Sequence, residues 1–419
     1  MDGVDRGRLR LPIALVAAVV VAEAAVLLLR PRDGVIDPAP VSARSYFSDA
    51  QIDRARDFRR PQLALYGGTL LIEAGLLAAL VARPPRRLRG PWRRPVLAGV
   101  ATGAALSVAL TAATLPVGAV MRERSRDVGL STQSWGGWAG DVGKSAGISA
   151  VLVGLGAGGF LLLQRRFPRH WWAPGSLAVV ALGATFAYAG PVVLDPVFNR
   201  FEPLPEGRTR SDVLELARRA GVKVGQVYEV DASRRTTAAN AYVTGLGSTK
   251  RVVLYDTLLE NFTRDEIRLV VAHELSHVHH RDVPNGILYL ALVAPFGVLA
   301  VQRLGERFAP GRAGTPGTLP ATALSLALVA GAIVVVSNQL SRRIEARADS
   351  YALQLTRQPE PFIGFERRIA VRNLSDPDPP RWQVVLLSTH PPIVERIGTG
   401  VAFSQRALRP IPRRTPEGS

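Results

Sequence analysis

The chain has 419 residues, of which 47% are apolar, and a formal net charge of +18 at pH 7. It contains no cysteine, which excludes disulfides, thiolate metal ligands and cysteine nucleophiles. Any metal site must therefore use histidine and carboxylate ligands. The positive charge comes almost wholly from arginines that lie beside apolar segments. This pattern favours anionic lipid headgroups as partners and argues against nucleic acid.

Seven apolar stretches are long enough to cross a bilayer, whose hydrocarbon core of ~30 Å needs about 20 helical residues. The first follows a basic start, as in a signal peptide, but its long apolar run contains Glu23, so we expect a retained span. Glu23 and Glu73 lie inside apolar runs, where a carboxylate usually faces a protein interior or water; the alternative is that each reaches the interface near a helix end. The stretches are roughly 11–29, 62–82, 95–120, 146–164, 173–193, 286–304 and 319–340.

The segments between these stretches differ in character. Residues 42–60 are predicted to form an amphipathic surface helix capped by Ser48. Residues 121–145 are predicted to form a glycine-rich loop in which Trp135 and Trp138 anchor the interface.

After residue 193 the chain becomes more polar. The pattern predicts a helix from Ser211 to Ala220, with Ser211 as its cap and Gly221 just past its end. Three runs favour β-strands and predict a small sheet. They are Gln226–Val230, Ala241–Thr244 and Arg251–Tyr255.

A His-Glu-x-x-His pattern stands at His273, Glu274 and His277, preceded by helix-forming residues. Residues four apart lie on the same face of a helix, so the two imidazoles can bind one metal ion while Glu274 addresses a water beside it. Zinc suits imidazole ligands and keeps one position open in catalytic sites. The pattern also arises by chance in long chains, so it remains a hypothesis until a third ligand is found.

The third ligand candidate is Glu345, which lies four residues before Asp349 on one predicted helix face. A catalytic zinc usually has three protein ligands, so Glu345 can complete the site. Asp349 can accept the outer N–H of a ligand histidine and fix its tautomer. The alternative is an ordinary surface helix with Glu/Arg pairs.

His390 precedes Pro391 and Pro392, and this rigid turn would present the imidazole as a fixed hydrogen-bond donor. Such a donor can stabilise the oxyanion of a tetrahedral intermediate. The alternative is a loop histidine without a role. His280 lies near the ligand face of the motif helix, but solvated surface is the simpler interpretation for it and for His279.

With these residues in place, the chain resembles the integral-membrane zinc metallopeptidases of the CAAX prenyl protease type 1 family, including their bacterial relatives. The resemblance covers roughly 194–400, while residues 1–193 agree in pattern more than in letters. It rests on five segments in the family's order: LDPVFNRFEPL (194–204), NAYVTGLGSTKRVVLYDTLL (240–259), HELSHVHHRD (273–282), SRRIEARADSYAL (341–353) and STHPPIVERI (388–397).

The resemblance implies a role for each of these residues. His273, His277 and Glu345 would hold one zinc ion per chain. Glu274 would be the general base, with Asp349 behind the ligands. Two further implications concern substrate: Asn240, Ala241 and Tyr242 would form an edge strand that holds an extended peptide. His390 and Arg396 would bind substrate and the developing oxyanion.

The predicted fold is mainly α: about seven transmembrane helices enclose a chamber, and a gluzincin-like zinc protease domain carries a small β-sheet. The first part is an N-terminal membrane domain of five spans, with an amphipathic helix near 42–60. The parts are the membrane domain (1–193), the soluble protease part with the zinc helix (194–285), two further spans (286–340), the C-terminal protease part with the third ligand (341–400) and a basic, disordered tail (401–419).

The expected function is hydrolysis of peptide or protein substrates, membrane-associated ones included, by a zinc metalloendopeptidase. A multi-pass location in a bacterial plasma membrane suits membrane-protein quality control or peptide processing. The family's orientation puts the protease domain in the cytoplasm, whereas the basic segments are nearly balanced between the two sides. The alternative from another class is a transporter or receptor with a soluble insertion. A distance above about 6 Å between Glu345 and the two histidines would favour that alternative.

Overall fold

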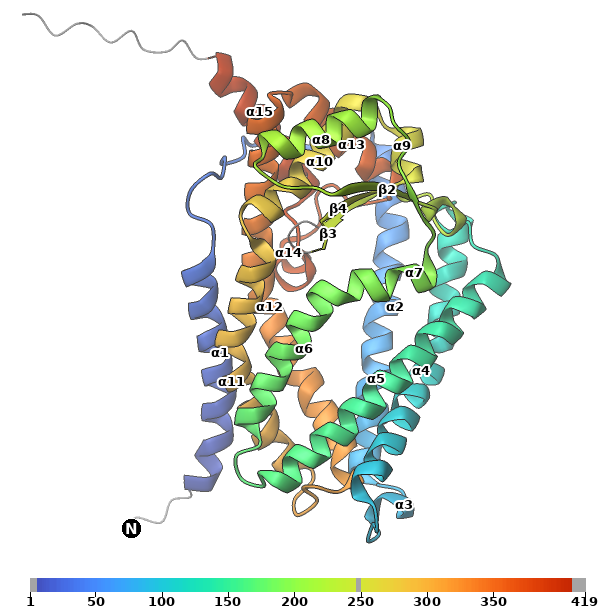
Figure 1. Cartoon of the computed structure of the whole chain (residues 1–419), viewed down its shortest axis with the longest axis vertical. Helices are drawn as coiled ribbons and strands as arrows, with labels where there is room; N and C mark the ends of the chain where they lie inside the picture. The colour runs from blue at the N-terminus through green and yellow to red at the C-terminus, as the bar shows by residue number, and fades with distance from the viewer. Residues whose placement is uncertain (1–5, 246–249, 409–419) are drawn as a thin grey trace, which may run out of the picture.

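The computed structural model of the protein describes residues 6–245 and 250–408. Within these residues, seven helices are long and apolar enough to cross a membrane, which confirms the predicted number of spans. In Figure 1 they form a long bundle, and a small sheet with several shorter helices lies at one end of it. The seven are α1 (Arg6–Leu29), α2 (Asp49–Ala82), α4 (Pro95–Asp127), α5 (Trp135–Arg166), α6 (Trp172–Val193), α11 (Asp282–Phe308) and α12 (Leu319–Thr356).

In the described part of the chain, eight shorter helices accompany the seven long ones, and all but α3 lie at the end of the molecule that carries the sheet (Figure 1). They are α3 (Arg86–Arg89), which lies at the opposite end, α7 (Asp195–Phe198), α8 (Arg208–Arg219), α9 (Asp256–Asn261), α10 (Arg264–His279), α13 (Pro359–Arg372), α14 (Arg381–Leu387) and α15 (Ile393–Leu408).

Two of the predicted connections, residues 42–60 in the first and residues 121–145 in the third, differ from the structure. Residues 42–60 do not form a separate surface helix, because α2 continues from Asp49 through Pro61 to the end of the second span. The predicted cap is confirmed: the Ser48 hydroxyl accepts from the Gln51 N–H, and the Gln51 side chain accepts from the Ser48 N–H. The predicted loop 121–145 is reduced to the few residues between α4 and α5, because both helices extend into it.

Two helix ends also differ from prediction. Helix α8 begins at Arg208 with Gly207 as its cap, and the Ser211 hydroxyl donates to the Gly207 carbonyl instead of capping the helix. Gly221 does lie just past the end, with φ of 67°. The predicted disordered tail begins too early, because α15 runs to Leu408; residues 409–419 lie outside the described residues.

The sheet has four strands in the order β1-β2-β4-β3. The three predicted strands are confirmed with their bounds: β2 (Gln226–Val230), β3 (Ala241–Thr244) and β4 (Arg251–Tyr255). The sequence analysis missed β1 (Phe201–Pro203), which pairs antiparallel with β2. Strands β2 and β4 are parallel, whereas β3 is antiparallel to β4 and forms one edge of the sheet. Residues 246–249, between β3 and β4, lie outside the described residues.

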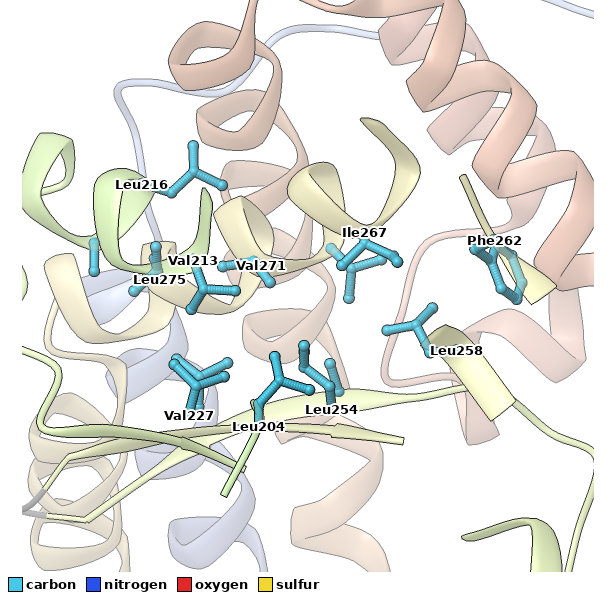
Figure 2. Packing of buried hydrophobic residues seen from close by; sticks show 14 of the residues in the cluster. Leu204, Val213, Leu216, Val227, Leu254, Leu258, Phe262, Ile267, Val271 and Leu275 are labelled. Atoms are coloured by element: carbon cyan, nitrogen blue, oxygen red, sulfur yellow. The ribbon is translucent and has the colours of Figure 1, made fainter. Parts of the chain in front are cut away.

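Helix α10 is held from two sides. Its Val271 and Leu275 pack with Val213, Leu216 and Leu254 into a core between α8, α10 and the sheet (Figure 2). On its other side, a second buried cluster joins it to α12, α13 and α15; this cluster contains Leu269, Ala272, Leu353, Phe362 and Phe403. Burial of this kind contributes about 1.5–3 kcal/mol for each large apolar side chain. The helix with the metal motif is therefore fixed in position by packing.

The last membrane span and the segment with the third ligand candidate form a single helix. Helix α12 runs for 38 residues without a break, from its apolar start to the polar segment that contains Glu345 and Asp349. Near its middle, the Gln339 amide donates to the carboxylate of Glu23 on α1 at 3.0 Å. A polar partner of this kind explains how Glu23 is tolerated inside an apolar run.

Candidate metal centre

Helix α10 presents its two motif histidines on one face. The helix begins with a capping box in which Thr263 and Glu266 satisfy each other's backbone N–H groups. Further along the helix, His273 and His277 lie one turn apart, with ring centroids 5.1 Å from each other. The packing described above leaves these two rings directed toward α12.

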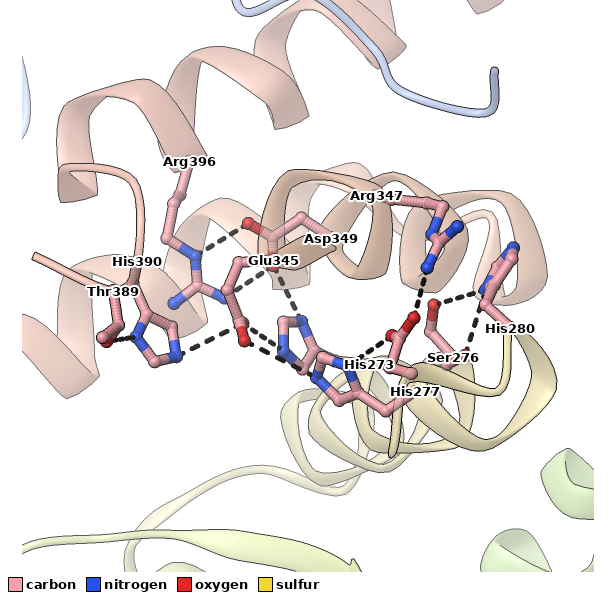
Figure 3. A network of polar contacts seen from close by, with 11 residues as sticks. His273, Ser276, His277, His280, Glu345, Arg347, Asp349, Thr389, His390 and Arg396 are labelled. Atoms are coloured by element: carbon pink, nitrogen blue, oxygen red, sulfur yellow. Dashed lines mark hydrogen bonds and ion pairs between the residues drawn. The ribbon is translucent and has the colours of Figure 1, made fainter. Parts of the chain in front are cut away.

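Glu345 on α12 meets both histidines (Figure 3). Its Oε2 lies 3.1 Å from His273 Nε2, and its Oε1 lies 3.8 Å from His277 Nε2. One ligand atom from each of the three residues lies within 4.8 Å of the others. All these distances are below the 6 Å that would have favoured a transporter or receptor. Two imidazole nitrogens and a carboxylate at this spacing fit the donor set of a catalytic metal ion.

Each histidine makes an outer hydrogen bond that leaves its Nε2 free for a metal. His273 Nδ1 donates to Asp349 Oδ1 at 2.9 Å, as the spacing of Glu345 and Asp349 predicted. His277 Nδ1 donates to Asp282 Oδ2 at 3.0 Å, a contact that the sequence analysis did not predict. Carboxylates at this position fix the tautomer and the ring orientation of metal-binding histidines.

Glu274 lines a cavity of about 500 Å³, and His273, His390 and Asn240 line it as well. Burial raises the pKa of Glu274, and the positive charge of the neighbouring histidines opposes that rise. A carboxylate with a raised pKa accepts a proton more readily than an exposed one, which is the property required of a general base.

His390 lies on the opposite side of Glu345 from α10. Its Nε2 is 3.2 Å from Glu345 Oε2, and its Nδ1 is 3.0 Å from the hydroxyl oxygen of Thr389. If the hydroxyl donates to Nδ1, the proton of the neutral imidazole is on Nε2, which then points toward the candidate metal centre. The His390 side chain is 57% exposed, and its partial removal from water lowers its pKa, which favours this neutral form, while the charge of Glu345 opposes the effect.

Asn240 and Tyr242, which are predicted to bind substrate, lie at the edge of the sheet. Asn240 is exposed and lines the cavity next to Glu274, and β3 begins at the next residue on the edge of the sheet. The hydroxyl of Tyr242 donates to Asp195 at 3.0 Å, which anchors the strand.

Arg396 lines the cavity beside Glu274 and is also held by two carboxylates. Its Nε and Nη2 donate to the two oxygens of Asp349 at 2.8 and 2.6 Å, and its Nη1 lies 2.9 Å from Glu366 Oε2. These contacts connect the guanidinium group to the candidate metal centre, and substrate binding by Arg396 stays a prediction.

Three residues of the centre were missed by the sequence analysis: Asp282, Arg347 and Glu366. Asp282 contacts both His277 and Arg347. A signal for Asp282 was available, since an acidic residue follows the second motif histidine by five positions. Arg347 and Glu366 stand in segments rich in arginine and glutamate that resemble solvated helix faces, and no signal in the sequence separates them from their neighbours.

Comparison with known proteins agrees with this geometry. The profile described as "Peptidase family M48" matches residues 203–399. A curated relative, "Uncharacterized metalloprotease YhfN" of Bacillus subtilis, is 34% identical over 301 residues, which are 70% of this chain and 70% of that protein. "CAAX prenyl protease 1" of Saccharomyces cerevisiae is 34% identical over 158 residues, 37% of this chain and 34% of that protein. The chain thus aligns with about a third of the yeast relative's length.

The fold also has a counterpart among solved structures. The crystal structure of S. mikatae Ste24p is similar with a TM-score of 0.73 and 20% sequence identity. The similarity covers 94% of this chain and 98% of that one. It confirms the predicted fold class, in which seven membrane helices are combined with a small sheet.

Proposed function

The chain belongs to peptidase family M48 and is an integral-membrane metallopeptidase, and from this premise we propose that zinc is its metal and that His273, His277 and Glu345 hold it. The observation that carries the proposal is the approach of these three side chains to one point, with both histidines oriented by aspartates. The approach also argues against a non-catalytic transporter or receptor, because transport does not require such a site.

Bound zinc would supply a Lewis acid that polarises a peptide carbonyl and lowers the pKa of water from ~16 to about 7. Glu274 would take the proton from the attacking water and pass it to the leaving amine. The N–H at His390 Nε2 would donate to the carbonyl oxygen as it becomes negative. Asp349 and Asp282 would keep the two ligand histidines in the tautomer with the proton on Nδ1.

The substrate would bind as an extended peptide along β3. One side of β3 is paired with β4, and Asn240, Ala241 and Tyr242 lie at the end of β3 nearest the cavity with Glu274. A peptide added to the other side of β3, which pairs with no strand among the described residues, would satisfy its own backbone groups and bring one carbonyl to the metal centre. We therefore propose peptides and proteins, including membrane-associated ones, as substrates.

The proposal for the cellular role is supported by the composition of the chain and by the bacterial source of one relative. The yeast relative is named a CAAX prenyl protease, whereas YhfN comes from a bacterium. The composition of this chain, rich in arginine and alanine, suits a bacterial source. We propose a bacterial plasma membrane location, with the protease domain in the cytoplasm and a role in membrane-protein quality control or peptide processing.

The test compares wild type with Glu274→Ala on a fluorogenic peptide library, using detergent-purified protein and measuring zinc content in both. We expect the variant to keep its zinc and to lose cleavage by ~10²–10⁴-fold, the contribution of a general base. Glu260→Ala, at an exposed position on α9, serves as the matched control and should cleave like wild type. Wild-type protein without zinc, or equal cleavage by wild type and Glu274→Ala, would contradict the proposal.

A further inference from the structure

Glu366 on α13 is a buried carboxylate outside the proposed catalytic group. It has no exposed surface, and its Oε2 forms an ion pair with Arg396 Nη1 at 2.9 Å, while neither of its oxygens has a hydrogen-bond partner among the described residues. A carboxylate taken out of water is costly unless a cation or hydrogen-bond donors compensate it. Among the residues that the structure describes, Arg396 is the only cation within 4.0 Å of Glu366. The two side chains therefore constrain each other.

Arg396 extends this contact to the candidate metal centre. On its other edge, Nε and Nη2 donate to both oxygens of Asp349, which is 1% exposed. Asp349 Oδ1 in turn accepts from His273 Nδ1 at 2.9 Å. The contacts thus form one series, Glu366–Arg396–Asp349–His273, whose members come from α13, α15, α12 and α10.

The shape of the guanidinium group explains how a distant carboxylate can influence the histidine. The group is planar and rigid, so the position of one nitrogen determines the direction of the other two. When Glu366 holds Nη1, the opposite edge of Arg396 can only face Asp349 in one orientation. Without Glu366, Arg396 could tilt about its contact with Asp349, and the Asp349 carboxylate could rotate with it.

We propose that Glu366 is a positioning residue for the peptidase reaction: by holding Arg396, it fixes the Asp349 carboxylate against His273. The inference rests on the proposed function, since it takes His273 as a metal ligand. It assigns Arg396 to the support of the metal centre. Glu366 borders the cavity beside Glu274, but its side chain has no exposed surface, so we place its action through Arg396.

The first test measures zinc affinity by competition with a chelator, using full-length, detergent-purified Glu366→Gln. This change keeps the size of the side chain and removes its charge. We expect affinity to fall about 10-fold, the lower end of the ~10–100-fold range for residues that support metal ligands. Under saturating zinc, kcat should fall while KM stays within about 2-fold, because the substrate cavity keeps its shape. Glu360→Gln, an exposed position on the same helix, is the matched control and should change neither value.

A double-mutant cycle separates positioning from a general structural role. Arg396→Lys keeps one positive charge but cannot bridge two carboxylates in fixed geometry. If Glu366 acts through Arg396, Glu366→Gln should lower zinc affinity much less in the Arg396→Lys background than in wild type. Equal effects in the two backgrounds would overturn the proposal, even if each variant alone binds zinc more weakly.

Two further outcomes have defined meanings. If Glu366→Gln fails to fold, Glu366→Asp replaces it, because the shorter side chain keeps the charge but lies farther from Arg396. Unchanged zinc affinity in Glu366→Asp overturns the inference. Zinc binding by wild type with unchanged affinity in Glu366→Gln overturns the inference and leaves the proposed function intact. Absence of zinc binding in wild type overturns both.

Discussion

His273 and His277 lie one turn apart on α10, and each donates its Nδ1 proton to an aspartate that also contacts an arginine. For His277 the aspartate is Asp282, five residues further along the chain, at the start of α11. For His273 it is Asp349, which lies 76 residues away on α12. We call each aspartate and its arginine a support: Asp349 with Arg396 for His273, and Asp282 with Arg347 for His277. The two supports make the same kind of contact. The His277 support begins with a residue nearby in the sequence, whereas the His273 support joins distant segments.

The two supports also differ in depth. The side chains of Asp349 and Asp282 are 1% and 10% exposed, respectively. Arg396 continues from Asp349 to a second carboxylate, Glu366, which is fully buried. Arg347 contacts Asp282, and no second carboxylate within ion-pair distance of Arg347 is found among the described residues. Water can replace a lost partner more easily at the shallower support, so the His273 support should be the more sensitive of the two.

The largest expected effect comes from removing the two arginines. Arg396→Met leaves Asp349 and Glu366 without their shared cation, and breaking a buried ion pair in this way typically lowers the free energy of unfolding by ~3–5 kcal/mol. Arg347→Met leaves Asp282 with His277 as a partner. The free energy of unfolding should therefore fall by the amount typical of a single buried hydrogen bond, ~1–3 kcal/mol. Thermal denaturation of both variants in the same detergent measures the difference. Equal losses would mean that depth does not distinguish the two supports.

Zinc affinity should show a smaller but parallel difference between the two aspartates. We expect Asp349→Asn to weaken binding toward the upper end of the ~10–100-fold range and Asp282→Asn toward its lower end. Competition with a chelator gives both values. Asp265→Asn, exposed in the first turn of α10, is the control that should bind like wild type. A greater loss in Asp282→Asn than in Asp349→Asn would reverse the ranking.

The same contrast explains which parts of the candidate site were predictable. Spacing on a helix was enough for His273, His277, Glu345 and Asp349, because residues four apart share a face wherever the helix lies. Asp282 depends on the turn between α10 and α11, where Arg281 adopts a φ of 57°. Arginine rarely adopts this left-handed conformation, so nothing in its identity predicts that the chain turns here.

Predictions of the membrane helices were limited for a different reason. Apolarity marks the part of a helix that can lie in lipid, and it located all seven spans. It does not mark where the helix ends. Helices α2 and α5 begin at the capping residues Ser48 and Ser134, well before their apolar stretches. Capping residues mark these two helix starts, whereas Ser211 does not cap α8 and Pro61 does not end α2.

The smallest expected effect concerns pH and belongs to the His273 support alone. Burial raises the pKa of Glu366 to about 7, although the charge of Arg396 opposes this rise. Asp349, Glu345 and His273 also face this carboxyl, the first two raising and the third lowering its pKa. The pKa of an unfolded glutamate is about 4.3. Between these two values the folded protein binds the proton more tightly than the unfolded chain does.

The contribution of Glu366 to stability is therefore fully present below about pH 4 and is lost as pH rises through about 7. Glutamine does not titrate, so raising the pH from about 6 to about 7 should favour Glu366→Gln over wild type by ~1 kcal/mol. Thermal denaturation with a chelator present, which removes the pH dependence of metal binding, measures the shift. Glu360→Gln should track wild type at both pH values. Absence of a shift between these two pH values would mean that Arg396 outweighs burial and that Glu366 stays charged at both, in which case its hold on Arg396 would be stronger than a half-protonated carboxyl allows.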